Sequence, residues 1–274
     1  MDEPRTYPHG VPCWVDTEQP DTDAARAFYG GLFGWEFEDV APAASYAIAR
    51  LDGRDVAAIG SAADAAPAWN TYVAVDDADS TAARVTRLGG AVLAAPQDAG
   101  PGGRFAICAD GQGAEFRLWQ PRRRLGAQLV NVPGSWNFSG LSTPDPAAAR
   151  AFYDALFGWE ADEVVDLAAT WRRPGYGDHL AATVDPEIRT RQAQVQTPPE
   201  FADVIAWLKP ADSTESARWQ VTFAVADRDD SVARAERLGG KVVGDPVQDG
   251  WTRTAAIRDP QGAELTLSEF APAG

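Results

Sequence analysis

The feature that most constrains the fold of this chain is an internal repeat. Residues 26–36 read RAFYGGLFGWE, and residues 150–160 read RAFYDALFGWE, so nine of eleven residues are identical at a separation of 124 positions. A match that keeps four aromatic residues in place does not arise by chance, and self-similarity at a fixed spacing is the signature of a duplicated structural unit. The chain is therefore predicted to be a tandem duplication, in which any binding site should be sought twice.

A second repeat lies inside each half. RLGGAV at residues 87–92 returns as RLGGKV at residues 237–242. Apolar residues at helical spacing, bounded by Asp and Gly, predict helices at 22–33, 78–88, 146–157 and 229–238. One strand precedes each helix and short strands follow it, with strand candidates at 11–19, 35–40, 45–51, 55–61, 69–76, 91–95, 104–108, 114–120, 136–142, 219–226, 241–244, 252–257 and 263–269. The element order is therefore βαβββ, repeated four times.

The two repeats have different offsets, 124 and 150 positions, so about 26 residues are inserted in the C-terminal half. We place this insertion at about 187–212, where Pro198-Pro199 indicates a loop. Long loops in compact domains are often lids or binding loops, and an inert excursion or a dimer contact is an equal alternative. The predicted domains are residues 1–121 and 133–274, with a linker at 122–132 that holds the basic run Arg122–Arg124.

The charge of the chain limits its partners. The sequence has 24 basic and 40 acidic residues, a net charge of −16. Such a surface repels phosphate backbones and anionic lipids, so neither nucleic acid nor a membrane is an expected partner. No apolar run is long enough to span a bilayer, and the first residues do not resemble a signal peptide. With only Cys13 and Cys108 and no CxxC motif, a reducing cytoplasm is the expected compartment.

The helix ending FYxxLFGW in the first and third units, and the late DxxGAE turn in the second and fourth, resemble the vicinal oxygen chelate superfamily of glyoxalases, bleomycin-resistance proteins and extradiol dioxygenases. The resemblance is most specific to two-domain glyoxalase-like proteins. It implies an α+β fold, in which four tandem βαβββ modules form two cupped, open mixed sheets with helices outside and a ligand on the concave face. The superfamily contains metalloenzymes and metal-free binders, so the fold leaves the chemistry open.

Active members of this superfamily hold a divalent ion through His, Gln or Glu side chains on the first strands and the last strand of paired modules. Carried over by spacing, these positions fall on Cys13, Asn70 and Arg117 in one half, and on Asn137, Gln220 and Thr266 in the other. A guanidinium opposes a cation, and Asn, Gln and Thr together make a weak site. We therefore predict no metal and no other cofactor. A register shift of two residues would make Glu115 and Glu264 the ligands instead.

Strand alternation adds further residues to the predicted binding faces. The candidate ligand-binding residues are Cys13, Asn70, Tyr72, Arg117 and Trp119 in the N-terminal half, and Asn137, Ser139, Gln220, Thr222 and Thr266 in the C-terminal half. Trp and Tyr beside amides and hydroxyls are typical of a pocket for a planar or polycyclic molecule. The N-terminal face is the preferred candidate, although Arg117 could equally form an ion pair with Glu115 or Asp16.

Two functions remain open. The first is a metal-independent protein, monomeric or homodimeric, that binds a small aromatic or antibiotic-like molecule, as bleomycin-resistance proteins do. The second is a glyoxalase-type lyase or isomerase with an unrecognised divalent-metal site. Whether the protein is an enzyme is left open, and no catalytic residue is identified: GxSxG, Walker A and HExxH motifs are absent from the sequence.

Overall fold

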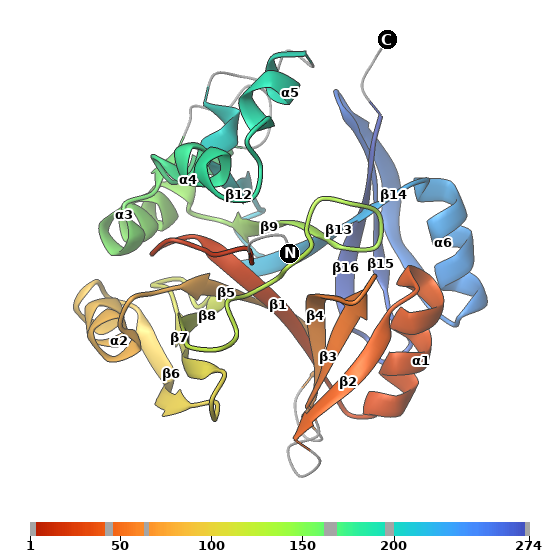
Figure 1. The fold of residues 1–274 in the computed structure, drawn as a ribbon, viewed down its shortest axis with the longest axis horizontal. Coiled ribbons are helices and arrows are strands. Elements are labelled where there is room, and N and C mark those ends of the chain that lie inside the picture. Colours follow the sequence, from red (N-terminus) through yellow and green to blue (C-terminus); the bar gives the residue numbers. More distant parts are fainter. Residues whose placement is uncertain (1–3, 42–45, 63–65, 162–168, 195–199, 272–274) are drawn as a thin grey trace. The chain divides into compact units, whose positions relative to one another are not determined.

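The computed structural model describes residues 4–41, 46–62, 66–161, 169–194 and 200–271, and it confirms an α+β fold of four βαβββ modules (Figure 1). The first module contains β1 (Pro12–Gln19), α1 (Thr22–Phe33), β2 (Glu36–Ala41), β3 (Tyr46–Leu51) and β4 (Arg54–Ser61). The second contains β5 (Ala68–Ala74), α2 (Ala78–Arg87), β6 (Ala91–Asp98), β7 (Gly103–Ala109) and β8 (Glu115–Pro121). The predicted helices and strands of these modules are present.

The third and fourth modules repeat this order. The third contains β9 (Trp136–Thr143), α3 (Pro146–Phe157), β10 (Glu160–Ala161), β11 (Ala169–Arg172) and β12 (Val204–Pro210). The fourth contains β13 (Arg218–Val225), α6 (Arg228–Arg237), β14 (Lys241–Asp249), β15 (Thr252–Arg258) and β16 (Glu264–Phe270). Among the described residues, no helix is long and apolar enough to cross a membrane.

The strands form two open mixed sheets of eight, as the resemblance implied. Their orders are β2-β3-β4-β1-β5-β8-β7-β6 and β10-β11-β12-β9-β13-β16-β15-β14. In every module the first strand pairs in parallel with the last: β1 with β4, β5 with β8, β9 with β12 and β13 with β16. The pairings described between consecutive strands of a module are antiparallel. A parallel pair needs a long connection, and the helix of each module supplies part of it.

Local signals fix the helix ends, and they are those that the sequence predicted. The Asp21 carboxylate accepts a hydrogen bond from the backbone N–H of Ala24, and Gly34 ends α1 with φ = 76°. Asp145 and Gly158 play the same roles for α3, with φ = 68° at the glycine. An acceptor at the N-cap satisfies an exposed helix donor, and the left-handed C-terminal position favours glycine.

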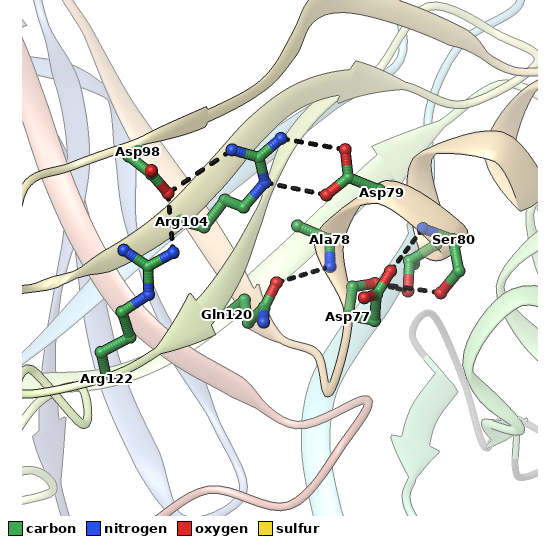
Figure 2. A network of polar contacts seen from close by, with 9 residues as sticks. Asp77, Ala78, Asp79, Ser80, Asp98, Arg104, Gln120 and Arg122 are labelled. Atoms are coloured by element: carbon green, nitrogen blue, oxygen red, sulfur yellow. Dashed lines mark hydrogen bonds and ion pairs between the residues drawn. The ribbon is translucent and has the colours of Figure 1, made fainter.

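Strand side chains also anchor the start of α2, as Figure 2 shows. Arg104 of β7 donates both Nε and Nη2 to the carboxylate of Asp79 at 2.8 and 2.9 Å. Gln120 of β8 accepts from the backbone N–H of Ala78 at 3.1 Å. Arg122, in the predicted linker, donates to Asp98 at 2.8 Å, so the linker begins as a continuation of this network.

The inserted residues of the third module lie between β11 and β12. They include α4 (Tyr176–Ala182), α5 (Ile188–Gln194) and the short 3-10 helix η1 (Phe201–Asp203). In the first module only Asp52 and Gly53 separate the equivalent strands, β3 and β4. The predicted range of 187–212 was therefore placed too late, because residues 204–210 form the core strand β12.

The chain groups into two compact units that do not follow the two halves of the sequence. Compact unit 1 comprises Met1–Cys13, Thr71–Gly126 and Ser139–Trp219, and so combines most of the second and third modules. Compact unit 2 comprises Trp14–Asn70, Ala127–Phe138 and Gln220–Gly274, and combines most of the first and fourth. The division into domains at 1–121 and 133–274 remains a prediction.

One hydrogen-bonded chain of side chains recurs in the core of both units. In compact unit 2, the Trp69 indole donates to the Tyr29 hydroxyl at 3.0 Å, and that hydroxyl donates to Asp259 at 2.8 Å. The other carboxylate oxygen of Asp259 accepts three backbone N–H groups, at residues 261–263. We call this Trp–Tyr–Asp arrangement a triad. It joins the FYxxLFGW helix of the first module to the DxxGAE turn of the fourth.

The equivalent triad in compact unit 1 joins the third module to the second. The Trp219 indole donates to the Tyr153 hydroxyl at 2.9 Å, which donates to Asp110 at 3.3 Å. The second carboxylate oxygen of Asp110 accepts the backbone N–H groups of Gln112 and Ala114. Tyr29 and Tyr153 are both fully buried, and burial raises their pKa well above the ordinary value for tyrosine. Both phenols therefore remain neutral donors in the folded protein.

We predict that Tyr29→Phe and Tyr153→Phe each lower the free energy of unfolding by about 1–3 kcal/mol, because each leaves a buried indole N–H without its acceptor and removes a hydrogen bond to a buried aspartate. Urea denaturation followed by Trp fluorescence measures the change. Thr86→Val, at an exposed position of α2, is the control and should change the unfolding free energy little. A tyrosine variant as stable as the control would show that the triad does not support the fold.

Candidate functional site

The side chains of β1 divide between the two faces of its sheet differently from the prediction. Asp16, which is fully buried, accepts from the Asn70 amide and from the Tyr46 hydroxyl, both at 2.9 Å. The Tyr46 hydroxyl in turn accepts from the Trp14 indole at 3.2 Å. Because alternate residues of a strand point to opposite faces, Trp14 and Asp16 lie on the face that Asn70 shares.

Cys13 lies on the opposite face of β1. Gln19, which has the same alternation as Cys13, donates to Asp259 and to Thr17, on the side where α1 places Tyr29. The prediction that Cys13 and Asn70 line one face is therefore corrected by one residue, and Trp14 takes the first-strand position. The sequence carried a signal for this: Asn70 precedes the helix-capping Asp77 by seven residues, and Trp14 precedes Asp21 by the same number.

The same correction applies to β9. The Ser139 hydroxyl lies 2.7 Å from that of Thr71, and both residues are buried. Thr71 stands between Asn70 and Tyr72 in β5, so it points to the opposite face from both. Asn137 shares the alternation of Ser139, and its amide donates to Asn131 at 3.2 Å. Asn137 and Ser139 therefore do not lie on the face for which they were predicted.

Tyr72, Arg117 and Trp119 come together in compact unit 1, as the sequence predicted. Tyr72 of β5 and Arg117 of β8 are register partners, and Arg117 Nη1 donates to the Tyr72 hydroxyl at 2.9 Å. The Arg117 guanidinium carbon lies 5.5 Å from the centre of the Tyr72 ring, and Nη2 lies 3.7 Å from the Glu115 carboxylate. Arg117 is only 3% exposed and Tyr72 6%. The cluster is thus a filled part of the protein interior.

Trp119 is fixed by the chain that follows β8. Its indole N–H donates to the backbone carbonyl of Arg124 at 2.9 Å, and its ring packs edge-on against Tyr72 at 6.4 Å. A Cβ at Gly103 would lie 2.6 Å from the Trp119 ring, so only glycine allows this approach. The polar atoms of Trp119 and Tyr72 are therefore engaged in contacts within the protein.

The fourth module presents a more open arrangement in compact unit 2. Thr222 of β13 and Thr266 of β16 are register partners, and Thr254 of β15 pairs with Ser268. Gln220, Thr222, Thr254 and Thr266 are all half-buried. Phe223, beside Thr222 in β13, packs on the rings of Phe33 and Trp69 at 5.0 and 4.8 Å, so the threonine points to the other face. We call the surface made by Gln220, Thr222, Thr254 and Thr266 the hydroxyl face.

The residues at the family's metal-ligand positions do not fit a divalent ion. After the correction of β1, these positions in the first two modules hold Trp14, Asn70 and Arg117, of which only the amide could ligate. The hydroxyl face offers Gln220 and Thr266, which are neutral and weak donors. Among the described residues, no group of three or more His, Cys, Asp or Glu could hold a metal ion. The absence of a metal stays a prediction.

The cysteines are not poised as nucleophiles. Cys13 and Cys108 are free thiols with no exposed surface. Burial raises the pKa of the Cys13 thiol far above its usual range and that of Cys108 to about 12. Since the thiolate is the reactive form, neither residue can act as a nucleophile near neutral pH.

Four modules whose first and last strands pair in parallel define the vicinal oxygen chelate fold. The family described as "Glyoxalase-like domain" matches residues 14–119 and 139–268, and this chain belongs to that family. Solved structures agree on the fold. The Mn(II)-bound glyoxalase from Novosphingobium aromaticivorans has a TM-score of 0.61 at 17% identity, with 96% of this chain and 84% of that chain covered. The 2,3-dioxygenase LapB from Pseudomonas sp. KL28 has the same TM-score at 12% identity, with 96% and 93% covered.

Relatives of known sequence cover nearly the whole chain. The putative glyoxylase CFP32 of Mycobacterium tuberculosis is 34% identical over 275 residues, which is 97% of each protein. The anthracycline biosynthesis protein DauV of Streptomyces sp. strain C5 is 34% identical over 281 residues, with 95% of this chain and 94% of DauV covered. DnrV of Streptomyces peucetius, also named an anthracycline biosynthesis protein, is 33% identical with the same shares covered.

The donor chemistry leads to a first prediction about metals. Protein purified without chelator should contain no stoichiometric Mn, Fe, Ni or Zn, and EDTA should leave its Tm unchanged, since a resident ion would stabilise the folded state by mass action. Inductively coupled plasma mass spectrometry and differential scanning fluorimetry measure the two quantities. One ion per chain, or a Tm that falls with EDTA, would contradict the prediction.

A second prediction concerns the cysteines. At pH 8 the native protein should react with Ellman's reagent much more slowly than the protein in urea, because burial keeps both thiols protonated and inaccessible. Complete unfolding should release two reactive thiols per chain. Rapid modification of one thiol in the native state would show that Cys13 or Cys108 is accessible, and Cys13→Ser and Cys108→Ser would identify which.

Proposed function

We propose that this protein binds a small aromatic or polycyclic molecule on the hydroxyl face, without a metal ion. The observation that carries the proposal is the residue set at the ligand positions: an indole, an amide and a buried guanidinium in the first two modules, and an amide and a threonine in the fourth. These groups bind organic functional groups through hydrogen bonds, whereas they do not complete a coordination shell.

The contrast between the two sheets favours the hydroxyl face over the Tyr72–Arg117–Trp119 cluster. In that cluster Tyr72 and Arg117 are buried and bonded to one another, and the Trp119 indole is bonded to the backbone. On the hydroxyl face, by comparison, Gln220, Thr222 and Thr266 remain half-exposed. A few polar groups that can donate and accept are what orient a ligand whose flat body supplies most of the contact area.

The names of two relatives support an aromatic ligand. DauV and DnrV are named anthracycline biosynthesis proteins, and both are related to this chain over about the same full length. Anthracyclines are polycyclic, with carbonyl and hydroxyl groups that threonine hydroxyls and a glutamine amide can pair with. We propose that the partner of this protein is such a small molecule. The acidic protein acts as a monomer or a homodimer, and it binds neither nucleic acid nor a membrane.

The second candidate is a glyoxalase-type lyase or isomerase with an unrecognised divalent-metal site. It is favoured by the names of the mycobacterial relatives and by the fold shared with a Mn(II)-bound glyoxalase. The two candidates differ in their need for metal. Conversion of the glutathione–methylglyoxal hemithioacetal only after Mn²⁺ is added would support the enzyme and contradict the metal-free proposal.

The binding proposal is tested by titrating EDTA-treated protein with doxorubicin, an anthracycline, while following the drug's fluorescence. We expect saturable binding that added Mn²⁺ does not change. Thr222→Val with Thr266→Val removes two hydroxyls at nearly constant volume, and it should weaken binding at least about tenfold, since each hydrogen bond contributes about 1 kcal/mol.

Thr86→Val on α2 is the matched control and should bind like the wild type. Absence of saturable binding, or a dependence on added metal, would contradict the proposal. Binding that survives the double threonine substitution but is lost in Trp119→Phe would move the site to the second module.

A further inference from the structure

The hydroxyl face continues beyond its four defining residues, toward the end of β16. Phe270 is the register partner of Thr252, and Val247 of β14 is the register partner of Thr254. Register partners point to the same face of a sheet, and so do residues two apart in a strand, so both apolar side chains lie on the face of Thr254 and Thr266. Phe270 is 59% exposed and Val247 53%, the highest fractions for large apolar side chains in the described part of compact unit 2. Two exposed apolar side chains therefore adjoin the hydroxyls.

The polarity of this face changes along β16. At the start of the strand the Glu264 carboxylate accepts from the Arg258 guanidinium, Thr266 follows, and Phe270 stands at the end. Residues four apart in a strand are separated by about 13 Å, which is the distance from Thr266 to Phe270. Val247 and Phe270 belong to the strands on either side of β15, which lie about 10 Å apart. The face therefore suits a long, flat molecule that is polar at one end and apolar at the other.

The internal repeat shows that aromatic rings pack on these rows of the sheet. In the second module Phe105 of β7 and Trp119 of β8 are register partners. Their equivalents in the fourth module are the register partners Thr254 and Ser268, because β8 and β16 each continue directly from a DxxGAE turn. The second module thus supplies two rings of its own at positions where the fourth module has a small threonine and a small serine.

We propose that Phe270 and Val247 make the hydroxyl face selective for ligands with an extended flat body of several fused rings. This inference rests on the proposed binding of a ligand at that face. The polar edge of the ligand pairs with Thr222 and Thr266, and its apolar end covers Phe270, at a position where the second module has Pro121. Covering exposed apolar side chains removes their surface from water, which favours binding. A single ring is too short to cover Phe270 while it keeps a hydrogen bond to Thr266.

The selectivity is tested by equilibrium dialysis of the full chain with two probes that share a hydroxyl beside a carbonyl: quinizarin, which is tricyclic, and salicylamide, which has a single ring. Quinizarin should bind the wild type about tenfold more tightly, because it buries more apolar surface. Phe270→Ala and Val247→Ala should each weaken quinizarin binding about fivefold and change salicylamide binding less than about twofold. Leu93→Ala, at a similarly exposed apolar position of β6, is the control and should bind both probes like the wild type.

Phe270→Tyr keeps the ring and should keep the affinity for quinizarin. Unchanged quinizarin binding in both alanine variants, or an equal loss for the two probes, overturns the selectivity. The binding proposal still stands in that case if Thr222→Val with Thr266→Val weakens doxorubicin binding. If neither doxorubicin nor quinizarin binds, the binding proposal itself fails, and the selectivity fails with it. Saturable binding of doxorubicin without any binding of quinizarin overturns the selectivity alone.

Discussion

The hydrogen bonds of the two buried tyrosine hydroxyls are the interactions on which the rest of the structure depends. Tyr29 and Tyr153 each accept from an indole and donate to an aspartate whose other oxygen accepts the backbone of a tight turn. In a low-dielectric interior such a chain is stable only when every member is satisfied. It thereby requires the FYxxLFGW helix of one module and the DxxGAE turn of another to fold together. The pairings of first with fourth and second with third modules follow directly.

Once the triads hold the core, the other faces of the strands are free to diverge between modules. The second module places a guanidinium under a tyrosine ring and excludes water from both, which stabilises that sheet only as long as the partners stay together. The fourth module has threonines at the paired positions, and these side chains are half-exposed. A buried charged group and a half-exposed polar surface are alternative uses of one position. Duplication allows a single chain to contain both.

The sequence predicted the helices because their signals are local: an aspartate cap, an apolar stripe and a glycine at the end. It failed on β1 and β9, because side-chain direction depends on counting to a single residue. Counting eight residues back from Asp21 instead of seven exchanged Cys13 for Trp14 and inverted the whole face. The position of the insertion failed for another reason. Strand β12 is specified by its parallel pairing with β9, a contact distant in sequence that local patterns do not reveal.

The third module shows how the packing beside a repeated motif can change while the motif itself is kept. Phe37 and Ala49 face each other in the first module, and Ala161 and Trp171 occupy the same positions in the third. The large side chain has moved from one strand to its neighbour, so apolar volume is kept while its distribution changes. Trp171 also carries an indole N–H, which a phenylalanine side chain lacks. The Trp171 ring lies 5.3 Å from the rings of both Tyr153 and Trp159, so the core around the repeated motif remains packed although its large side chain comes from a different strand.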